Sequence, residues 1–273
     1  MSTLDHVHGR AASGNDGWVR AWPLSRRALI TLLTGSAVLL VVWSGVGLLY
    51  LWVLDDGPIG DADRWVNRWL EDHRTPTWNT LTHYGSMISD TLVKVILVAV
   101  VGGIMMFIWR RWHDAVFLAV ALITEATLFL FSSLIVGRDR PPVEQLDPPA
   151  PSGSFPSGHT AAAVAFYVGV FVVVCWHTRH RGVRFVFGFV AVVAPIVVAF
   201  SRTYRGMHHS IDVVAGILLG VAVLFLVRAA LAKGVEDINR SSEDVPDRVR
   251  QLDLTSPEAN PSDRPVHQPG VRS

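Results

Sequence analysis

Long apolar runs separated by short polar segments dominate the chain. Six such runs occur, at residues 28–54, 91–109, 114–136, 160–176, 184–200 and 211–232. Each approaches the roughly 20 apolar residues that a helix needs to cross a bilayer. Because a helix satisfies its backbone hydrogen bonds internally, apolar runs of this length fold as helices in lipid. The pattern therefore predicts an all-α fold, a bundle of six transmembrane helices.

The polar flanks of these runs predict three parts. Residues 1–28 lack periodicity and are expected to form a mobile cytoplasmic tail. Residues 29–233 form the membrane domain, and its first run is too long for the core of a signal peptide. Residues 234–273 are rich in Asp, Glu, Arg, Ser and Pro and contain no aromatic residue, a composition typical of a disordered tail.

Between the first two runs lies a polar segment, residues 55–90, with helical periodicity of its own. Trp65, Trp69 and Leu70 recur at helical spacing among charged residues. This spacing predicts a short interfacial amphipathic helix with its indoles at the level of the lipid headgroups. A solvated loop helix is an equal reading of the same pattern.

Arginine clusters give the expected orientation. They precede the first span and separate the second from the third and the fourth from the fifth, so that with six spans they lie on one side with both termini. The positive-inside rule makes that side cytoplasmic, which predicts a multi-pass protein of the plasma (inner) membrane. The extracytoplasmic side then receives the segments 55–90, 137–159 and 201–210.

Charge and cysteine content exclude several classes of protein. The formal net charge is +1, which argues neither for nucleic acid nor for an acidic partner. The lone Cys175 excludes an internal disulfide and a cysteine-based metal site. We expect neither a metal nor a cofactor.

The polar segment before the last span carries candidate chemistry. His208 and Asp212 are four residues apart, so on a helix they share one face, and the carboxylate can hold one imidazole nitrogen. Arg202 provides forked donors suited to a phosphate. A basic juxtamembrane loop that meets lipid headgroups is the alternative reading of this segment.

Two further polar clusters lie at the outer ends of spans. One begins at Gly137 and includes Arg138 and Arg140; the other runs from Gly153 to His159. At the second, the N–H groups of the next helix and its positive dipole end would face an anion. Taken alone, this cluster is an ordinary helix start. Together the three clusters bring arginines, histidines and an aspartate to one membrane face.

These clusters resemble the three signature motifs of the type-2 phosphatidic acid phosphatase superfamily. The motifs are Arg140-Pro141, Pro156-Ser157-Gly158-His159, and Ser201-Arg202 followed by His208 and Asp212. The superfamily includes membrane lipid phosphatases and undecaprenyl-diphosphate phosphatases. The resemblance implies a metal-independent phosphoric monoester or diphosphate hydrolase whose lipid phosphate substrate enters from the bilayer.

The resemblance also implies roles for individual residues. His208 would attack phosphorus to form a phosphohistidine, with Asp212 orienting its ring, and His159 would protonate the leaving oxygen and then activate water. The phosphoryl oxygens would be held by Arg140, Arg202, the Ser157 side chain and the Gly158 backbone N–H.

One position departs from the family pattern. The family lysine, seven residues before the Arg of Arg-Pro, is replaced here by Ser133, which supplies no charge. Arg138, which we therefore include among the substrate-binding residues, and Lys94 are the cations available to compensate.

The predicted function is hydrolysis of a lipid phosphomonoester or diphosphate at the outer membrane face. A polyprenyl (undecaprenyl or decaprenyl) diphosphate or a phosphatidic-acid-type lipid is the expected substrate. Two alternatives stay open: a lipid phosphoryl transferase that uses the same site, and a non-catalytic lipid-phosphate binder or transporter.

Overall fold

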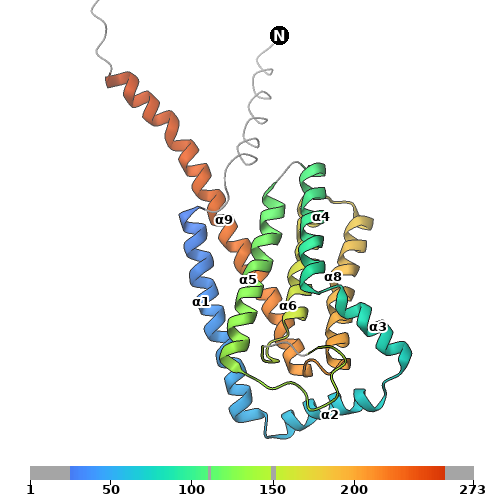
Figure 1. Ribbon diagram of the computed structural model, residues 1–273. Coiled ribbons are helices and arrows are strands. Elements are labelled where there is room, and N and C mark those ends of the chain that lie inside the picture. Colours follow the sequence, from blue (N-terminus) through green and yellow to red (C-terminus); the bar gives the residue numbers. More distant parts are fainter. Residues whose placement is uncertain (1–24, 110–111, 149–151, 256–273) are drawn as a thin grey trace, which may run out of the picture.

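The computed structural model describes residues 25–109, 112–148 and 152–255, with side chains described as far as residue 234. Within these ranges the regular structure is helical (Figure 1). The elements are α1 (Arg26–Leu49), η2 (Tyr50–Leu54), α2 (Pro58–Asp72), α3 (Pro76–Met87), α4 (Thr91–Trp109), α5 (Trp112–Val136), α6 (Gly158–Ala163), η3 (Val164–Val168), α7 (Gly169–His177), α8 (Arg181–Tyr204) and α9 (Ser210–Thr255).

Six helical segments of the described chain are long and apolar enough to cross a membrane. They are Arg26–Leu54, Thr91–Trp109, Trp112–Val136, Gly158–His177, Arg181–Tyr204 and Ser210–Gly234. Each coincides with one predicted run to within a few residues, because a bilayer-length apolar run leaves the helix as the usual solution. The predicted all-α six-helix bundle is therefore confirmed.

The fold surrounds a core made by α5, the Gly158–His177 span and α9. Phe117, Leu118, Val173, Leu219 and Val223 are among its buried side chains. Helices α1, α4 and α8 instead expose many large apolar side chains, as expected where lipid covers the outer surface.

Two short helices replace the one amphipathic helix expected between the first two spans. Both α2 and α3 begin with a proline, and the Thr75 side chain caps α3 by accepting from the Trp78 N–H at 3.2 Å. Trp65 and Trp69 on α2 are 59% and 46% exposed, as predicted for indoles at a membrane interface.

The opposite face of α2 is buried and polar. Asp63 and Asn67 are both buried, and the Asn67 amide donates to the His208 carbonyl at 3.1 Å. The Asp63 carboxylate accepts from the Ile211 N–H at 3.3 Å. Helix α2 is therefore tied to the loop before α9 by polar contacts.

All three predicted polar clusters lie at one end of the bundle with α2 and α3 (Figure 1). The first residues of α1, the end of α4, the start of α5 and the α7–α8 connection lie at the other end. This separation agrees with the predicted grouping, and the assignment of the cytoplasmic side stays a prediction. Helix α9 continues past the predicted domain boundary at residue 233 to Thr255, while most of the predicted N-terminal tail and residues 256–273 lie outside the described chain.

Candidate active site

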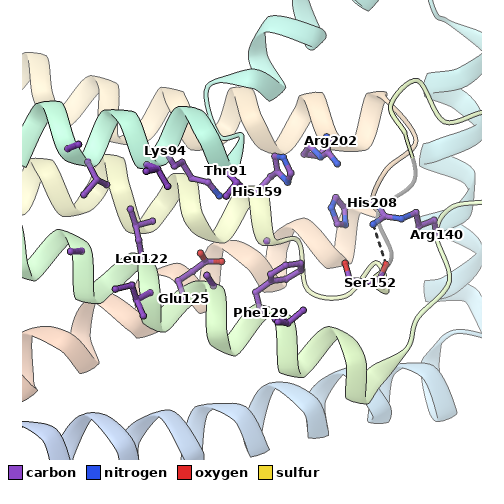
Figure 2. Close-up of a pocket in the computed structure, with 18 residues that line it drawn as sticks. Thr91, Lys94, Leu122, Glu125, Phe129, Arg140, Ser152, His159, Arg202 and His208 are labelled. Carbon is purple, nitrogen blue, oxygen red and sulfur yellow. Dashed lines mark hydrogen bonds between the residues drawn. The ribbon is translucent and has the colours of Figure 1, made fainter.

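A cavity of about 680 Å³ lies at the polar end of the bundle and extends between α4 and α5. Its polar end is formed by side chains from four separate parts of the chain, Arg140, Ser152, His159, Arg202 and His208 (Figure 2). Its apolar part includes Val95, Ile123 and Leu130, which are also exposed on the outside of the helices. The cavity thus joins a polar chamber to a lateral opening on the apolar surface of the bundle.

His208 lies in a tight turn between α8 and α9. Gly206 takes a φ of 71°, and an added Cβ would lie 2.7 Å from the Glu144 carbonyl oxygen, so a larger residue would disrupt the turn. The His208 ring is only 3% exposed, and its Nδ1 lies 2.7 Å from the Ser154 carbonyl oxygen. Because a carbonyl only accepts, Nδ1 carries the proton and Nε2 keeps its lone pair.

This geometry corrects the predicted role of Asp212. The shortest carboxylate contact to the His208 ring is 3.9 Å, from Nδ1 to Oδ2, too long for a hydrogen bond. Asp212 instead accepts from Arg138 at 2.6 Å and from the His209 backbone N–H at 2.9 Å. Asp212 therefore holds the loop, and a backbone carbonyl orients the histidine.

Burial lowers the pKa of His208 well below its usual value, and the nearby positive charge of Arg202 lowers it further. Its ring is therefore neutral at physiological pH. A neutral ring with a free Nε2 is the form that attacks an electrophile.

His159, at the start of the Gly158–His177 span, has a different kind of partner. Its Nε2 lies 3.0 Å from Oδ1 of Asp90, a residue that carried no predicted role. The hydrogen bond from His159 lowers the pKa of Asp90, so this carboxyl stays ionised and the ring donates to it. The Asp90 carboxylate orients the His159 ring for proton transfer, whereas the backbone carbonyl at His208 leaves the other nitrogen of that ring free as a nucleophile.

Arg202 has donor capacity to spare. Its Nη1 donates to the Ser86 hydroxyl at 2.9 Å and to Asp147 at 3.0 Å, but its buried Nε has no hydrogen-bond partner among the described residues. Because buried donors are nearly always paired, a bound anion would complete the contacts of this guanidinium. Arg205 is held by the same carboxylate, Asp147, at 2.6 and 2.8 Å.

Arg138 and Arg140 lie two residues apart but have opposite surroundings. Arg138 is 4% exposed and donates to Asp212 at 2.6 Å and to Asp55 and Asp63 at 3.0 Å each. Burial opposes its charge, but Asp212 and Asp63 raise the pKa of Arg138 above its usual value. Burial lowers the pKa of Arg140, which lines the cavity and donates to the Met207 carbonyl at 2.6 Å.

The geometry does not support the prediction that Arg138 binds substrate, because three carboxylates already contact this guanidinium. Arg140 keeps its predicted place at the cavity.

Ser157 and Gly158 lie where the sequence predicted, at the start of a span. Gly158 lines the cavity, and a Cβ there would lie 2.8 Å from the Phe129 ring, so this helix start approaches α5 closely. The Ser157 hydroxyl is within 3.0 Å of the Thr160 hydroxyl and is fully buried. It does not line the cavity, which leaves its predicted contact with substrate unsupported.

At the position of the family lysine, Ser133 makes a structural contact and supplies no charge. Ser133 is buried, and its hydroxyl donates to the Gly153 carbonyl at 3.4 Å. Of the two proposed compensating cations, only Lys94 lines the cavity. Asp90, Asp147 and Glu125 complete the charged residues at or beside the cavity. Asp90 lies just before a span and Glu125 within one, which was the available signal for these two, whereas Asp147 lies in mid-loop without any signal.

Comparison with known proteins finds similarity to one family. Residues 114–235 match the family model of the PAP2 superfamily. The chain is 29% identical over 164 residues to phosphatidylglycerophosphatase B of Bacillus subtilis (strain 168), covering 59% of this chain and 74% of that protein. It is 25% identical over 158 residues to undecaprenyl-diphosphatase BcrC of the same organism, covering 54% and 76%.

A solved structure shares the fold. The crystal structure of a transmembrane PAP2-type phosphatidylglycerolphosphate phosphatase from Bacillus subtilis superposes with a TM-score of 0.59 at 22% sequence identity. The superposition covers 77% of this chain and 98% of that chain.

Proposed function

We propose that the chain is an integral membrane lipid phosphatase that works through a phosphohistidine, a proposal supported by the match of residues 114–235 to the family model of the PAP2 superfamily. The observation that carries this proposal is the pairing of two differently supported histidines in one cavity. His208 presents a free Nε2, and His159 is held by a carboxylate, with Arg140 and Arg202 beside them.

In the first half-reaction, Nε2 of His208 bonds to phosphorus while the bond from phosphorus to the leaving oxygen breaks. His159 gives its proton to that oxygen, and the dephosphorylated lipid departs. In the second half-reaction a water attacks the phosphohistidine, His159 takes the water proton, and the phosphorus–nitrogen bond breaks to release inorganic phosphate. Arg140 and Arg202 neutralise the equatorial oxygens throughout, which is the main requirement of phosphoryl transfer.

The lateral opening supports a lipid as substrate, since the apolar part of the cavity suits a hydrocarbon chain and the polar chamber suits its phosphate. A polyprenyl diphosphate or a phosphatidic-acid-type lipid meets both requirements. The described arginine clusters, at the start of α1 and around the start of α8, lie at the opposite end of the bundle, which supports a site on the extracytoplasmic face.

Phosphate release by the purified protein tests the proposal. A panel of lipid mono- and diphosphates in detergent micelles, assayed with EDTA present, is expected to yield inorganic phosphate because guanidinium groups supply the charge neutralisation. A strict requirement for added magnesium contradicts this mechanism. A phosphorylated acceptor in place of free phosphate indicates a transferase, and binding without turnover indicates a binder or transporter.

The dependence of the rate on pH follows from the lowered pKa of His208. The reaction needs the neutral ring, and a group with a lowered pKa becomes protonated only at more acidic pH. We therefore expect kcat/KM to hold as pH falls through 6.5, the usual histidine pKa, and to decline only well below it. A decline centred at or above pH 6.5 contradicts the assignment.

Asp90→Asn tests the role of Asp90 as a positioning residue. Without the carboxylate the protonated form of His159 is less stable, so the acid loses its proton at lower pH. We expect kcat to fall by about 10- to 100-fold, less than the roughly 10²- to 10⁴-fold that a general acid itself contributes, and its alkaline limb to move to lower pH. A fall in kcat with an unmoved alkaline limb indicates a structural role only. Asp139→Asn, on the exposed part of the 137–157 loop, is a matched control that is expected to change neither quantity.

A further inference from the structure

Two charged side chains, Lys94 and Glu125, lie deeper in the cavity than the proposed reaction site. Lys94 follows Asp90 by four residues at the start of α4, and the Lys94 backbone N–H donates to the Asp90 carbonyl. Asp90 itself contacts His159. On α5, Glu125 is four residues from Phe129, whose ring packs against Gly158. Four residues of a helix, just over one turn, correspond to about 6 Å along the axis. Lys94 and Glu125 therefore form a layer about one turn beyond His159 and Gly158.

Lys94 is a cation without a close partner in this layer. Among the described residues its ammonium group forms no ion pair, although Glu125 and Asp90 attract its charge from farther away, and the surrounding lining is mainly apolar. Its side chain extends along the cavity toward His159 (Figure 2). An ammonium in apolar surroundings is strongly stabilised by an anion that enters with the substrate.

Glu125 faces the same layer from α5. It is 2% exposed and lines the cavity, and its Oε1 has no hydrogen-bond partner among the described residues. The two side chains therefore belong to one polar layer without forming a close ion pair. A purely structural pair would be expected to close to hydrogen-bonding distance.

We propose that Lys94 forms a second anion subsite, which binds a phosphate that remains with the lipid after the terminal phosphoryl group is transferred. This inference rests on the proposed function, since it names the leaving group of that reaction. The leaving oxygen lies at His159, and the chain continues from there toward the lateral opening, so the first group it presents to Lys94 is the one next to the cleaved bond.

Two kinds of lipid carry a second phosphate at this place. In a polyprenyl diphosphate the second phosphate is bonded directly to the first, and in a phosphatidylglycerophosphate a glycerol separates them. Both present the same chemistry to Lys94, a phosphate on the leaving-group side, and they differ in its distance from the cleaved bond.

Matched substrate pairs test the subsite. We would measure kcat/KM for a prenyl diphosphate against the prenyl monophosphate of equal length, and for phosphatidylglycerophosphate against phosphatidic acid with the same acyl chains. In Lys94→Met we expect kcat/KM to fall by about 10- to 100-fold for the two-phosphate member of one pair, the scale of one charge-assisted hydrogen bond, and by less than about threefold for its partner. The pair that shows this loss identifies the lipid.

An equal loss for both members of each pair would place Lys94 on the transferred phosphoryl group, as a substitute for the charge missing at Ser133, and would overturn the subsite. An unchanged kcat/KM in both pairs would overturn it too. Failure of the proposed function itself looks different, because then the unmodified protein releases no phosphate from any substrate. Retained monophosphate activity in Lys94→Met also shows that the variant is folded.

Glu125→Gln and the double variant separate the subsite from a structural pair. If Lys94 and Glu125 only neutralise each other, removing both charges restores activity lost in Lys94→Met. If Lys94 binds the second phosphate, the double variant stays selectively impaired, and Glu125→Gln alone leaves or improves activity on the two-phosphate lipid, since it removes a neighbouring carboxylate.

Discussion

His208→Ala is expected to reduce phosphate release by about 10⁴-fold or more, because it removes the atom that bonds to phosphorus and leaves only positioning and charge neutralisation. The remaining arginines still bind the lipid phosphate, so substrate affinity changes far less than turnover. Substrate labelled on the terminal phosphate, quenched under alkaline denaturing conditions, is expected to label the unmodified protein and not the variant.

A histidine at the same end of the bundle provides the control. His83 on α3 is exposed, packs edge-on against Tyr84 and does not line the cavity. His83→Ala should keep its activity and its phosphoenzyme label. If His208→Ala still forms labelled protein at the normal rate, another residue is the nucleophile and the proposed mechanism is wrong.

Arg138→Leu is expected to lower the stability of the folded protein by about 3–5 kcal/mol, the usual cost of removing one partner from a buried ion pair. The substitution leaves Asp63 and Asp212 buried without their shared cation, and it also removes the hydrogen bond to the Tyr50 hydroxyl at 3.1 Å. The measurements are the midpoint of thermal unfolding in detergent and the yield of folded protein.

Arg140→Leu is the matched comparison, since the two arginines are two residues apart and carry the same charge. We expect it to keep the unfolding midpoint close to that of the unmodified protein and to lose phosphatase activity, which is the reverse of Arg138→Leu. If Arg138→Leu unfolds normally but no longer binds lipid phosphate, the sequence-based assignment of Arg138 to the substrate is restored.

The six spans could be predicted because hydrocarbon thickness sets both the length and the composition of a crossing helix. The grouping of Arg140, His159, Arg202 and His208 around one cavity was also accessible, since topology alone places all three clusters at the same end. Which of Arg138 and Arg140 lines the cavity could not be predicted from the sequence. It depends on Tyr50, Asp55 and Asp63, which lie far away in the sequence and carry no recognisable motif.

The hydrogen-bond partners of the two histidines, Ser154 and Asp90, could not be predicted from side-chain patterns, for two different reasons. Ser154 holds His208 through its backbone carbonyl, which every residue possesses and no pattern distinguishes. Asp90 holds His159 across 69 positions of sequence, from a helix start without any signature. The spacing of His208 and Asp212 suggested a shared helical face, but His208 precedes α9 and its ring turns toward Ser154 instead.

The lateral opening beside Val95, Ile123 and Leu130 determines which substrate concentration governs the rate of this protein. A lipid that reaches the cavity through the side of the bundle is drawn from the surrounding bilayer or micelle and not from water. Turnover should therefore follow the mole fraction of substrate in that phase. Inert detergent would slow the reaction by surface dilution even when the total amount of substrate per volume stays constant.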